Sequence, residues 1–137
     1  MKTRTKETLE INDEQALISL RNTIRDRANS VGFGTLEQTK LITAASELAR
    51  NMLLYAGSGN IILEQVAVNG RTGLKLTFQD QGPGIANIEQ AMESGYTSGT
   101  GLGLGLPGAK RLVNEFEIKS KPGSGTVVKI ILWKHER

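Results

Sequence analysis

The chain has 137 residues and no cysteine, which excludes disulfide bonds and thiolate metal sites. Its hydrophobic content of 38% and charged content of 23% are typical of a globular domain, and no stretch is apolar and long enough to span a bilayer. The net charge of +3 is spread along the chain, which disfavours nucleic-acid binding. We therefore expect a single cytoplasmic domain over residues 1–137, without membrane or nucleic-acid partners.

The N-terminal part of the chain predicts a strand followed by two helices. Apolar and polar residues alternate over residues 5–12, as they do in a half-buried strand. Apolar residues then recur at helical spacing over residues 16–31, and Gly32 supplies a C-terminal stop. Thr35 and Gln38 have the spacing of a capping box, which predicts the start of a second, longer helix.

A β meander is predicted after this second helix, which ends before Gly57. Two strands, over residues 60–68 and 73–79, flank the turn signal Asn69-Gly70. A loop and a short helix around residues 87–93 follow them. The meander thus separates the helices of the first half from those of the second.

The last part of the chain predicts one more helix and two closing strands. A glycine run opens a helix over residues 104–114, in which Pro107 is tolerated because it falls in the first turn. The closing strands cover residues 116–120 and 126–132. Strands and helices in separate blocks indicate an α+β two-layer sandwich. A Rossmann fold would instead alternate strands with helices and place the glycine turn after the first strand.

The second helix carries a polar pair at its margin. Glu47 and Asn51 are four residues apart and therefore share one helix face. A carboxylate beside an amide oxygen suits a hard cation and a water or hydroxyl group. A solvent-exposed polar pair without a function is the alternative, and taken alone it is the more common one.

An acidic residue ends the second strand of the meander. Asp80 is followed by Gly82 and Gly84, so its carboxylate could accept a hydrogen bond from an exocyclic amine such as that of adenine. The glycines would let a planar base approach the backbone without Cβ clashes. An ordinary turn begun by an aspartate, with Pro83 inside it, is the alternative. Thr126, at the start of the last strand, could add a hydroxyl to the same pocket.

The glycine run is the strongest signal in the chain. Gly99, Gly101, Gly103 and Gly105 alternate just before a helix. Exposed backbone N–H groups and a helix N-terminus make an anion site, so phosphate is the expected ligand. A flexible hinge is the alternative. A loop that orders around a triphosphate would serve as cradle and lid together, and we expect that lid over residues 93–103.

These segments resemble the conserved boxes of the GHKL, or Bergerat-fold, ATPases. In chain order they match the N, G1, G2 and final Gly-Thr boxes: Glu47-x-x-x-Asn51, Asp80-x-Gly82-x-Gly84, Gly99-Thr100-Gly101-Leu102-Gly103-Leu104 and Gly123-x-Gly125-Thr126. The resemblance covers nearly the whole chain. It implies a two-layer α/β sandwich with a mixed, mainly antiparallel sheet and helices on one face.

Within this family the chain is similar to the anti-sigma-factor kinases, and among them to the switch kinases of the bacterial stressosome. Five segments carry that similarity, over residues 31–35, 46–51, 54–57, 80–85 and 105–112. Tyr55 stands where many anti-sigma kinases have histidine. Leu54 stands where sensor histidine kinases usually have lysine, which disfavours a histidine kinase fragment.

The similarity implies an ATP-dependent protein serine/threonine kinase. Its expected substrates are STAS-domain antagonist and scaffold proteins, and its expected target, once it is released, is a PP2C-type phosphatase. The alternative is a nucleotide-regulated binding module that sequesters a sigma factor or a STAS-domain partner without essential catalysis. Both alternatives use the nucleotide site. The presence of both Glu47 and Asn51 favours the kinase over the binding module.

The resemblance also implies a role for each matched residue. Glu47 would be the base that orients the substrate hydroxyl, and Asn51 would hold the Mg²⁺ that bridges the phosphates of ATP. The other nucleotide contacts would be the adenine-binding Asp80 and Thr126, the pocket-shaping Gly82 and Gly84, and the phosphate-wrapping Gly99, Thr100, Gly101, Leu102, Gly103 and Leu104. Arg21, or next Arg25, would contact the protein partner, although solvated helix charge explains both equally well.

Overall fold

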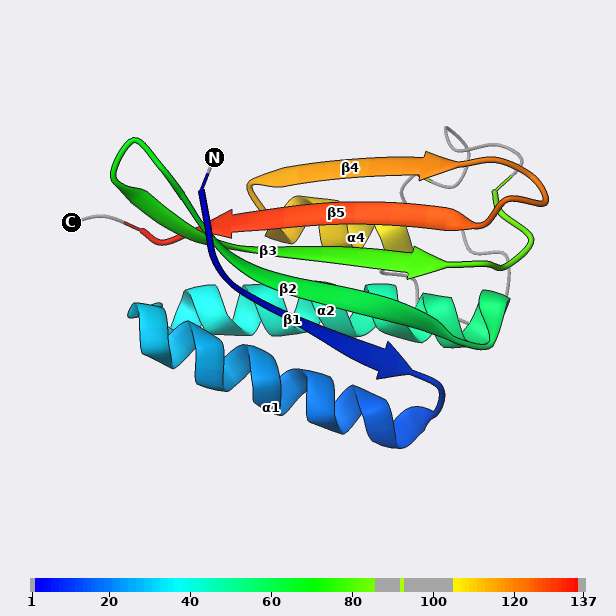
Figure 1. Ribbon diagram of the computed structural model, residues 1–137, viewed down its shortest axis with the longest axis horizontal. Helices are drawn as coiled ribbons and strands as arrows, with labels where there is room; N and C mark the ends of the chain where they lie inside the picture. The colour runs from blue at the N-terminus through cyan, green and yellow to red at the C-terminus, as the bar shows by residue number, and fades with distance from the viewer. Residues whose placement is uncertain (1, 86–91, 93–104, 136–137) are drawn as a thin grey trace.

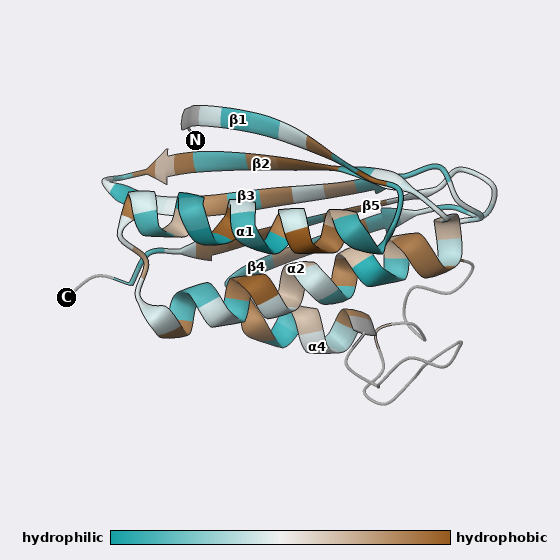
Figure 2. Cartoon of the chain, turned by 90° about the horizontal axis from the view of Figure 1, so that it is seen from below, coloured by the Kyte–Doolittle hydropathy of each residue, from teal (hydrophilic) through white to brown (hydrophobic). Residues whose placement is uncertain are grey.

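The computed structural model is a five-stranded sheet with helices packed against one face, and it describes residues 2–85, 92 and 105–135 (Figure 1). Its elements are β1 (Lys2–Ile11), α1 (Glu14–Val31), α2 (Thr35–Ala56), β2 (Gly59–Val68), β3 (Arg71–Asp80), α4 (Gly105–Leu112), β4 (Glu115–Ser120) and β5 (Thr126–Trp133). Figure 2 shows α1, α2 and α4 on the same side of the sheet. The short helix expected around residues 87–93 and the lid expected over 93–103 lie outside the described residues, except for residue 92.

The strand order is β1-β2-β3-β5-β4, and each neighbouring pair is antiparallel. The predicted hairpin between β2 and β3 is confirmed, because Asn69 and Gly70 have φ angles of 49° and 81°. Two successive positive φ angles are what a tight two-residue hairpin turn requires. The last strand, β5, is inserted between β3 and β4, so it pairs with a strand that lies far from it in the sequence.

The core lies between the sheet and the helices. On α1 the buried residues follow the helical period that the sequence predicts, and they are Leu17, Leu20, Ile24 and Ala28. On β3 alternate residues face the helices, and Leu74, Leu76 and Phe78 belong to the same buried cluster. The α+β two-layer sandwich expected from the sequence is therefore confirmed.

Both long helices end at a glycine, and their starts differ. Asp13 caps α1 by accepting a hydrogen bond from the backbone N–H of Ala16. The capping box predicted for α2 is wrong. Gly34 is the N-cap, and the Glu37 carboxylate accepts from its N–H at 2.7 Å. The cap therefore lies one residue before the predicted Thr35, and the Gln38 side chain instead donates to the carbonyl of Phe33 and to the side-chain oxygen of Asn29.

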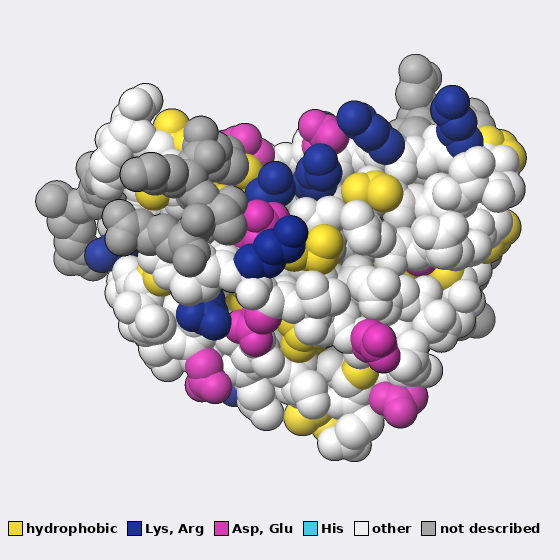
Figure 3. Space-filling view, viewed as in Figure 1, with side chains coloured by type: hydrophobic (Ala, Val, Ile, Leu, Met, Phe, Trp, Pro, Cys, Tyr) yellow, Lys and Arg dark blue, Asp and Glu magenta, His cyan; other side chains and the backbone are white. Residues whose placement is uncertain are grey.

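The surface carries charges of both signs. Acidic and basic side chains are interspersed over the face drawn in Figure 3, and hydrophobic side chains lie there singly or in small groups. In the part of the chain that the structure describes, no helix is both long enough and apolar enough to cross a membrane.

Candidate nucleotide-binding site

The candidate site begins where β3 ends. In the antiparallel register of β3 and β5, Asp80 lies directly opposite Thr126. The Asp80 carboxylate oxygen Oδ1 accepts a hydrogen bond from the backbone N–H of Gly82 at 2.9 Å. No donor among the described residues is bonded to its other oxygen, Oδ2. The sheet thus brings together two residues that the boxes place 46 positions apart in the sequence.

The glycines after Asp80 permit close packing. A Cβ atom on Gly82 would lie 2.6 Å from the Cβ of Ala56, the last residue of α2. A Cβ on Gly84 would lie 2.0 Å from the carbonyl oxygen of Lys121, and its φ of 79° is one that only glycine adopts readily. These glycines therefore let the loop contact both the end of α2 and the β4–β5 turn.

The β4–β5 turn is fastened to the same loop. The backbone N–H of Gly123 donates to the carbonyl of Pro83 at 2.7 Å. A Cβ on Gly125, which has a φ of 80°, would lie 2.1 Å from the carbonyl oxygen of Asp80. The end of β3 and the start of β5 consequently form one compact unit around the Asp80–Thr126 pair.

Ser120, at the end of β4, is a member of this unit that sequence reasoning missed. Its Oγ lies 2.8 Å from the backbone nitrogen of Ile85, 2.9 Å from the carbonyl oxygen of Gly125 and 2.8 Å from the Oγ1 of Thr126. One sequence signal could have found it. Ser120 stands two residues after Ile118, at a strand position that faces the helices and that elsewhere on β4 is hydrophobic.

The Glu47–Asn51 pair lies on α2, as predicted, and both residues are half-buried. The Glu47 side chain is 19% exposed, and its Oε1 lies 3.0 Å from the Nη1 of Arg50. Because a helix rises 1.5 Å per residue, Asn51 stands about 7.5 Å along the axis from Ala56, which contacts Gly82. The same helix thus carries the polar pair and packs against the loop that follows Asp80.

The two candidate partner-binding arginines lie on α1 and differ in their surroundings. Arg21 is half-buried, and its Nε donates to the Oγ of Ser46, a buried residue of α2, at 3.1 Å. Arg25 is exposed, and its Nη1 donates to the side chain of Asn22. Arg21 is thus held against α2 by Ser46, the residue before Glu47, whereas the hydrogen bond of Arg25 stays within its own helix.

The remaining predicted positions are not all described. Gly99, Thr100, Gly101, Leu102, Gly103 and Leu104 lie outside the described residues. The helix that follows them, α4, begins at Gly105 and has Pro107 in its first turn, as predicted. Within the described ranges no group of three or more His, Asp or Glu side chains is placed to hold a metal ion.

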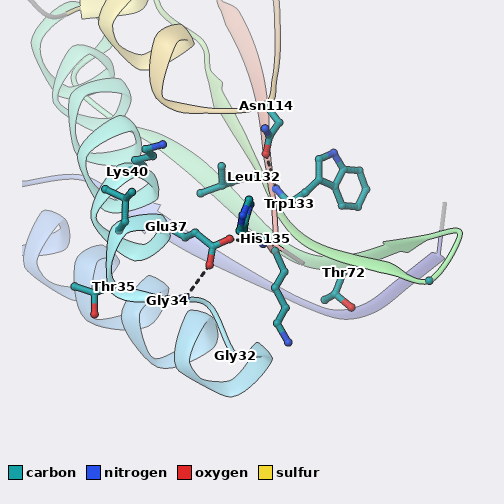
Figure 4. A pocket seen from close by; sticks show the side chains of 13 residues that line it. Gly32, Gly34, Thr35, Glu37, Lys40, Thr72, Asn114, Leu132, Trp133 and His135 are labelled. Carbon is teal, nitrogen blue, oxygen red and sulfur yellow. Dashed lines mark hydrogen bonds between the residues drawn. The ribbon is translucent and has the colours of Figure 1, made fainter. Parts of the chain in front are cut away.

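A hollow lies at the end of β3 and β5 opposite to Asp80 and Thr126 (Figure 4). Its lining includes Glu37, Lys40, Thr72, Trp133 and His135. Figure 4 shows the Glu37 side chain between Gly34 and the C-terminal segment, where it accepts from the N–H groups of Gly34 and His135. Its hydrogen bonds tie the start of α2 to the end of the chain. None of the described residues that are predicted to bind nucleotide lines this hollow.

Comparison with known proteins settles the family. A family model described as "Histidine kinase-, DNA gyrase B-, and HSP90-like ATPase" matches residues 36–136, which is most of the chain. The chain belongs to this family. Its ATPase domain is the GHKL domain expected from the four boxes, and membership implies that ATP is the nucleotide bound.

Two relatives of the chain are a serine/threonine-protein kinase and an anti-sigma factor. The chain is 49% identical over 120 residues to the serine/threonine-protein kinase RsbT of Bacillus subtilis (strain 168), covering 88% of this chain and 90% of RsbT. It is 31% identical over 105 residues to the anti-sigma F factor of Pasteuria penetrans, covering 71% of this chain and 69% of that protein. The expectation of a GHKL-type serine/threonine kinase is confirmed.

Solved structures of low sequence identity share the fold. The RsbU and RsbW domains of Rv1364c from Mycobacterium tuberculosis match with a TM-score of 0.60 at 18% identity, over 96% of this chain and 34% of that one. The mycobacterial sensor histidine kinase MprB matches with a TM-score of 0.58 at 20% identity, over 97% of this chain and 100% of that one. Both confirm the Bergerat fold of this family.

The close approach at Gly84 makes a testable prediction about the loop after Asp80. Gly84→Ala should destabilise the protein by at least about 1 kcal/mol more than Gly123→Ala, because the new Cβ would overlap the Lys121 carbonyl. Gly123 is a matched control, since its φ is also 80° but nothing lies within 4 Å of a Cβ there. Urea unfolding of both variants measures the difference, and equal losses would contradict the packing described.

Proposed function

We propose that residues 1–137 act as a single cytoplasmic kinase domain that transfers the γ-phosphoryl group of ATP to a serine or threonine of a STAS-domain protein. The observation that carries the proposal is the register of β3 and β5, which sets Asp80 opposite Thr126 beside the end of α2. The 49% identity to RsbT supports the kinase class. The family's ATPase chemistry supports ATP as phosphoryl donor.

The adenine end of the site rests on Asp80. Since Oδ1 is already bonded to the N–H of Gly82, Oδ2 is the oxygen available to accept from the exocyclic amine of adenine. Gly82 and Gly84 keep the backbone beside it free of side chains. The adenine ring would lie against this backbone, with Thr126 at the facing strand.

The phosphate end of the site rests on α2. The half-buried Asn51 offers an amide oxygen, and Mg²⁺ in kinases is commonly bound by one or two protein oxygens together with phosphates and water. Asn51 is therefore a fitting ligand, and the ion would neutralise charge on the phosphates during transfer. The backbone of residues 99–104 is our predicted cradle for the same phosphates.

Glu47, one turn before Asn51, is the proposed general base. Its carboxylate would accept the proton of the substrate hydroxyl as that oxygen bonds to the γ-phosphorus and the bond to the β–γ bridging oxygen breaks. The carboxylate is paired with Arg50 and is not fully covered, so a protein substrate could reach it. ADP and a phosphorylated serine or threonine would be the products.

The proposed partner surface lies on α1. Arg21 and Arg25 share a helix face with Ile18, a residue that is 48% exposed, because the three follow i, i+3, i+7 spacing. An exposed apolar residue beside two cations suits a partner segment that carries both apolar and acidic groups. We propose that a STAS-domain scaffold binds here and that its release lets the kinase activate a PP2C-type phosphatase.

A second candidate function is a nucleotide-regulated binding module. It is favoured by the relatives named anti-sigma F factor, such as that of Anoxybacillus flavithermus, at 30% identity over 101 residues. In that case a sigma factor or a STAS-domain protein would bind the ATP-loaded domain without being phosphorylated. The two functions differ in the fate of the γ-phosphate.

A transfer assay separates the two functions. The purified protein is incubated with γ-labelled ATP, Mg²⁺ and a panel of STAS-domain proteins, and labelled products are hydrolysed to identify the phosphoamino acid. The kinase proposal predicts label on serine or threonine of a panel member, and none when Mg²⁺ is chelated. A panel member that binds tightly but never acquires label would favour the binding module.

A further inference from the structure

The hydroxyl of Ser120 contacts three polar atoms of the candidate site but has only one proton to give. The Ile85 N–H can only donate, so Ser120 Oγ accepts from it at 2.8 Å. The Gly125 carbonyl can only accept, so the Ser120 proton points to it at 2.9 Å. The remaining contact, 2.8 Å from Thr126 Oγ1, is therefore satisfied only if Thr126 donates its own proton to Ser120.

This arrangement fixes the polarity of Thr126. With its proton committed to Ser120, the Thr126 hydroxyl can offer only lone pairs to a ligand. Asp80, directly opposite in the β3–β5 register, also offers only lone pairs, because an ionised carboxylate has no donor. The two facing strand positions therefore present acceptors, and the Gly82 N–H that could have donated is already bonded to Asp80.

We propose that Ser120 is a positioning residue that selects the base of the nucleotide. By holding Thr126 as an acceptor, it makes this edge of the pocket complementary to a purine that carries an amine at position 6. A purine with a carbonyl at that position would set its lone pairs against those of Asp80 and Thr126. These half-buried acceptors would then lack the amine as a donor, which is costly. The inference rests on the proposed function, because it presupposes that the ATP site lies at Asp80.

A purely structural role for Ser120 makes a different prediction. Ser120 ties the backbone of Ile85 to the β4–β5 turn, so its loss could loosen the whole pocket. A loosened pocket would weaken all nucleotides together. Only a residue that sets hydrogen-bond polarity changes the preference between two purines, so the ratio of their affinities is the informative quantity.

Calorimetric titration of the full chain with Mg·ATP and with Mg·ITP, whose base has a carbonyl at position 6, tests the proposal. The wild type should prefer ATP. In Ser120→Ala the Thr126 hydroxyl can turn and donate to a carbonyl, so the ATP:ITP affinity ratio should fall by about tenfold. Ser120→Thr keeps a hydroxyl at this position and should retain the ratio.

Thr126→Val tests the proposal independently, because it leaves Ser120 and its bonds to Ile85 and Gly125 in place. It should lower the ratio as well, and adding Ser120→Ala should lower it no further, since the two residues act as one unit. An unchanged ratio in either single variant would overturn the proposal while leaving the ATP site intact. A wild-type protein that binds neither nucleotide would overturn the proposed function itself.

Discussion

Glu47→Gln is expected to slow phosphoryl transfer to the STAS-domain substrate by about two to four orders of magnitude, the usual contribution of a positioned general base. Glutamine has the size of glutamate but cannot accept the substrate proton. ATP binding should stay within about twofold of the wild type, because the proposed partner of Glu47 is a hydroxyl that is not part of ATP. Single-turnover transfer rates and calorimetric ATP affinities measure the two effects separately.

The control for this substitution removes the same charge elsewhere. Glu117→Gln changes an exposed side chain on β4, whose 3.7 Å ion pair with Lys119 is solvent-exposed and contributes little. It should transfer phosphate at the native rate. Glutamine at position 47 can still accept a hydrogen bond from Arg50, whose side chain is half-exposed, so the unfolding free energy should change little. Native transfer rates in Glu47→Gln would mean that another group takes the proton.

Asp80→Asn is expected to weaken ATP binding by about 10- to 100-fold, which corresponds to roughly 1.4–2.8 kcal/mol. The structure explains why this substitution acts on the ligand rather than on the fold. An asparagine Oδ1 can still accept from the Gly82 N–H, so its NH₂ group takes the place of Oδ2, which has no partner among the described residues. A donor would then face the amine of adenine, where the wild type offers an acceptor.

A matched control exists at the other aspartate that bonds a nearby backbone N–H. Asp13 caps α1 through the N–H of Ala16 at 3.0 Å, and asparagine caps helices equally well. Asp13→Asn should therefore change neither ATP affinity nor stability appreciably. If both variants bound ATP like the wild type, adenine would have to be recognised elsewhere.

Local features of the fold could be predicted from the sequence because short-range physics determines them. The hairpin at Asn69-Gly70 follows from two positions that tolerate positive φ, and the buried stripe of α1 follows from its apolar spacing. The start of α2 was misplaced because two residues, Glu37 and Gln38, could each complete a cap. Only the three-dimensional arrangement shows that Gln38 is held by the Phe33 carbonyl.

Long-range features of the candidate site could not be predicted in the same way. Spacing places Asp80 and Thr126 in separate boxes, and their pairing depends on β5 inserting beside β3. The break that Ser120 makes in the hydrophobic face of β4 is visible in the sequence, but its contact with Ile85, 35 positions away, is not. The pair formed by Glu47 and Arg50, in contrast, has a spacing of three residues and was open to prediction from helix geometry.

The central claim is that this domain moves the γ-phosphoryl group of ATP directly to a serine or threonine of a partner protein. A single-turnover experiment tests it, in which the kinase is preloaded with one equivalent of Mg·ATP, mixed with a STAS-domain partner, and analysed by intact-protein mass spectrometry. The account predicts one phosphorylated serine or threonine on the partner for each ADP formed, with no phosphate on the kinase. A phosphorylated kinase, or ADP formed in the presence of a tightly bound but unmodified partner, would contradict it.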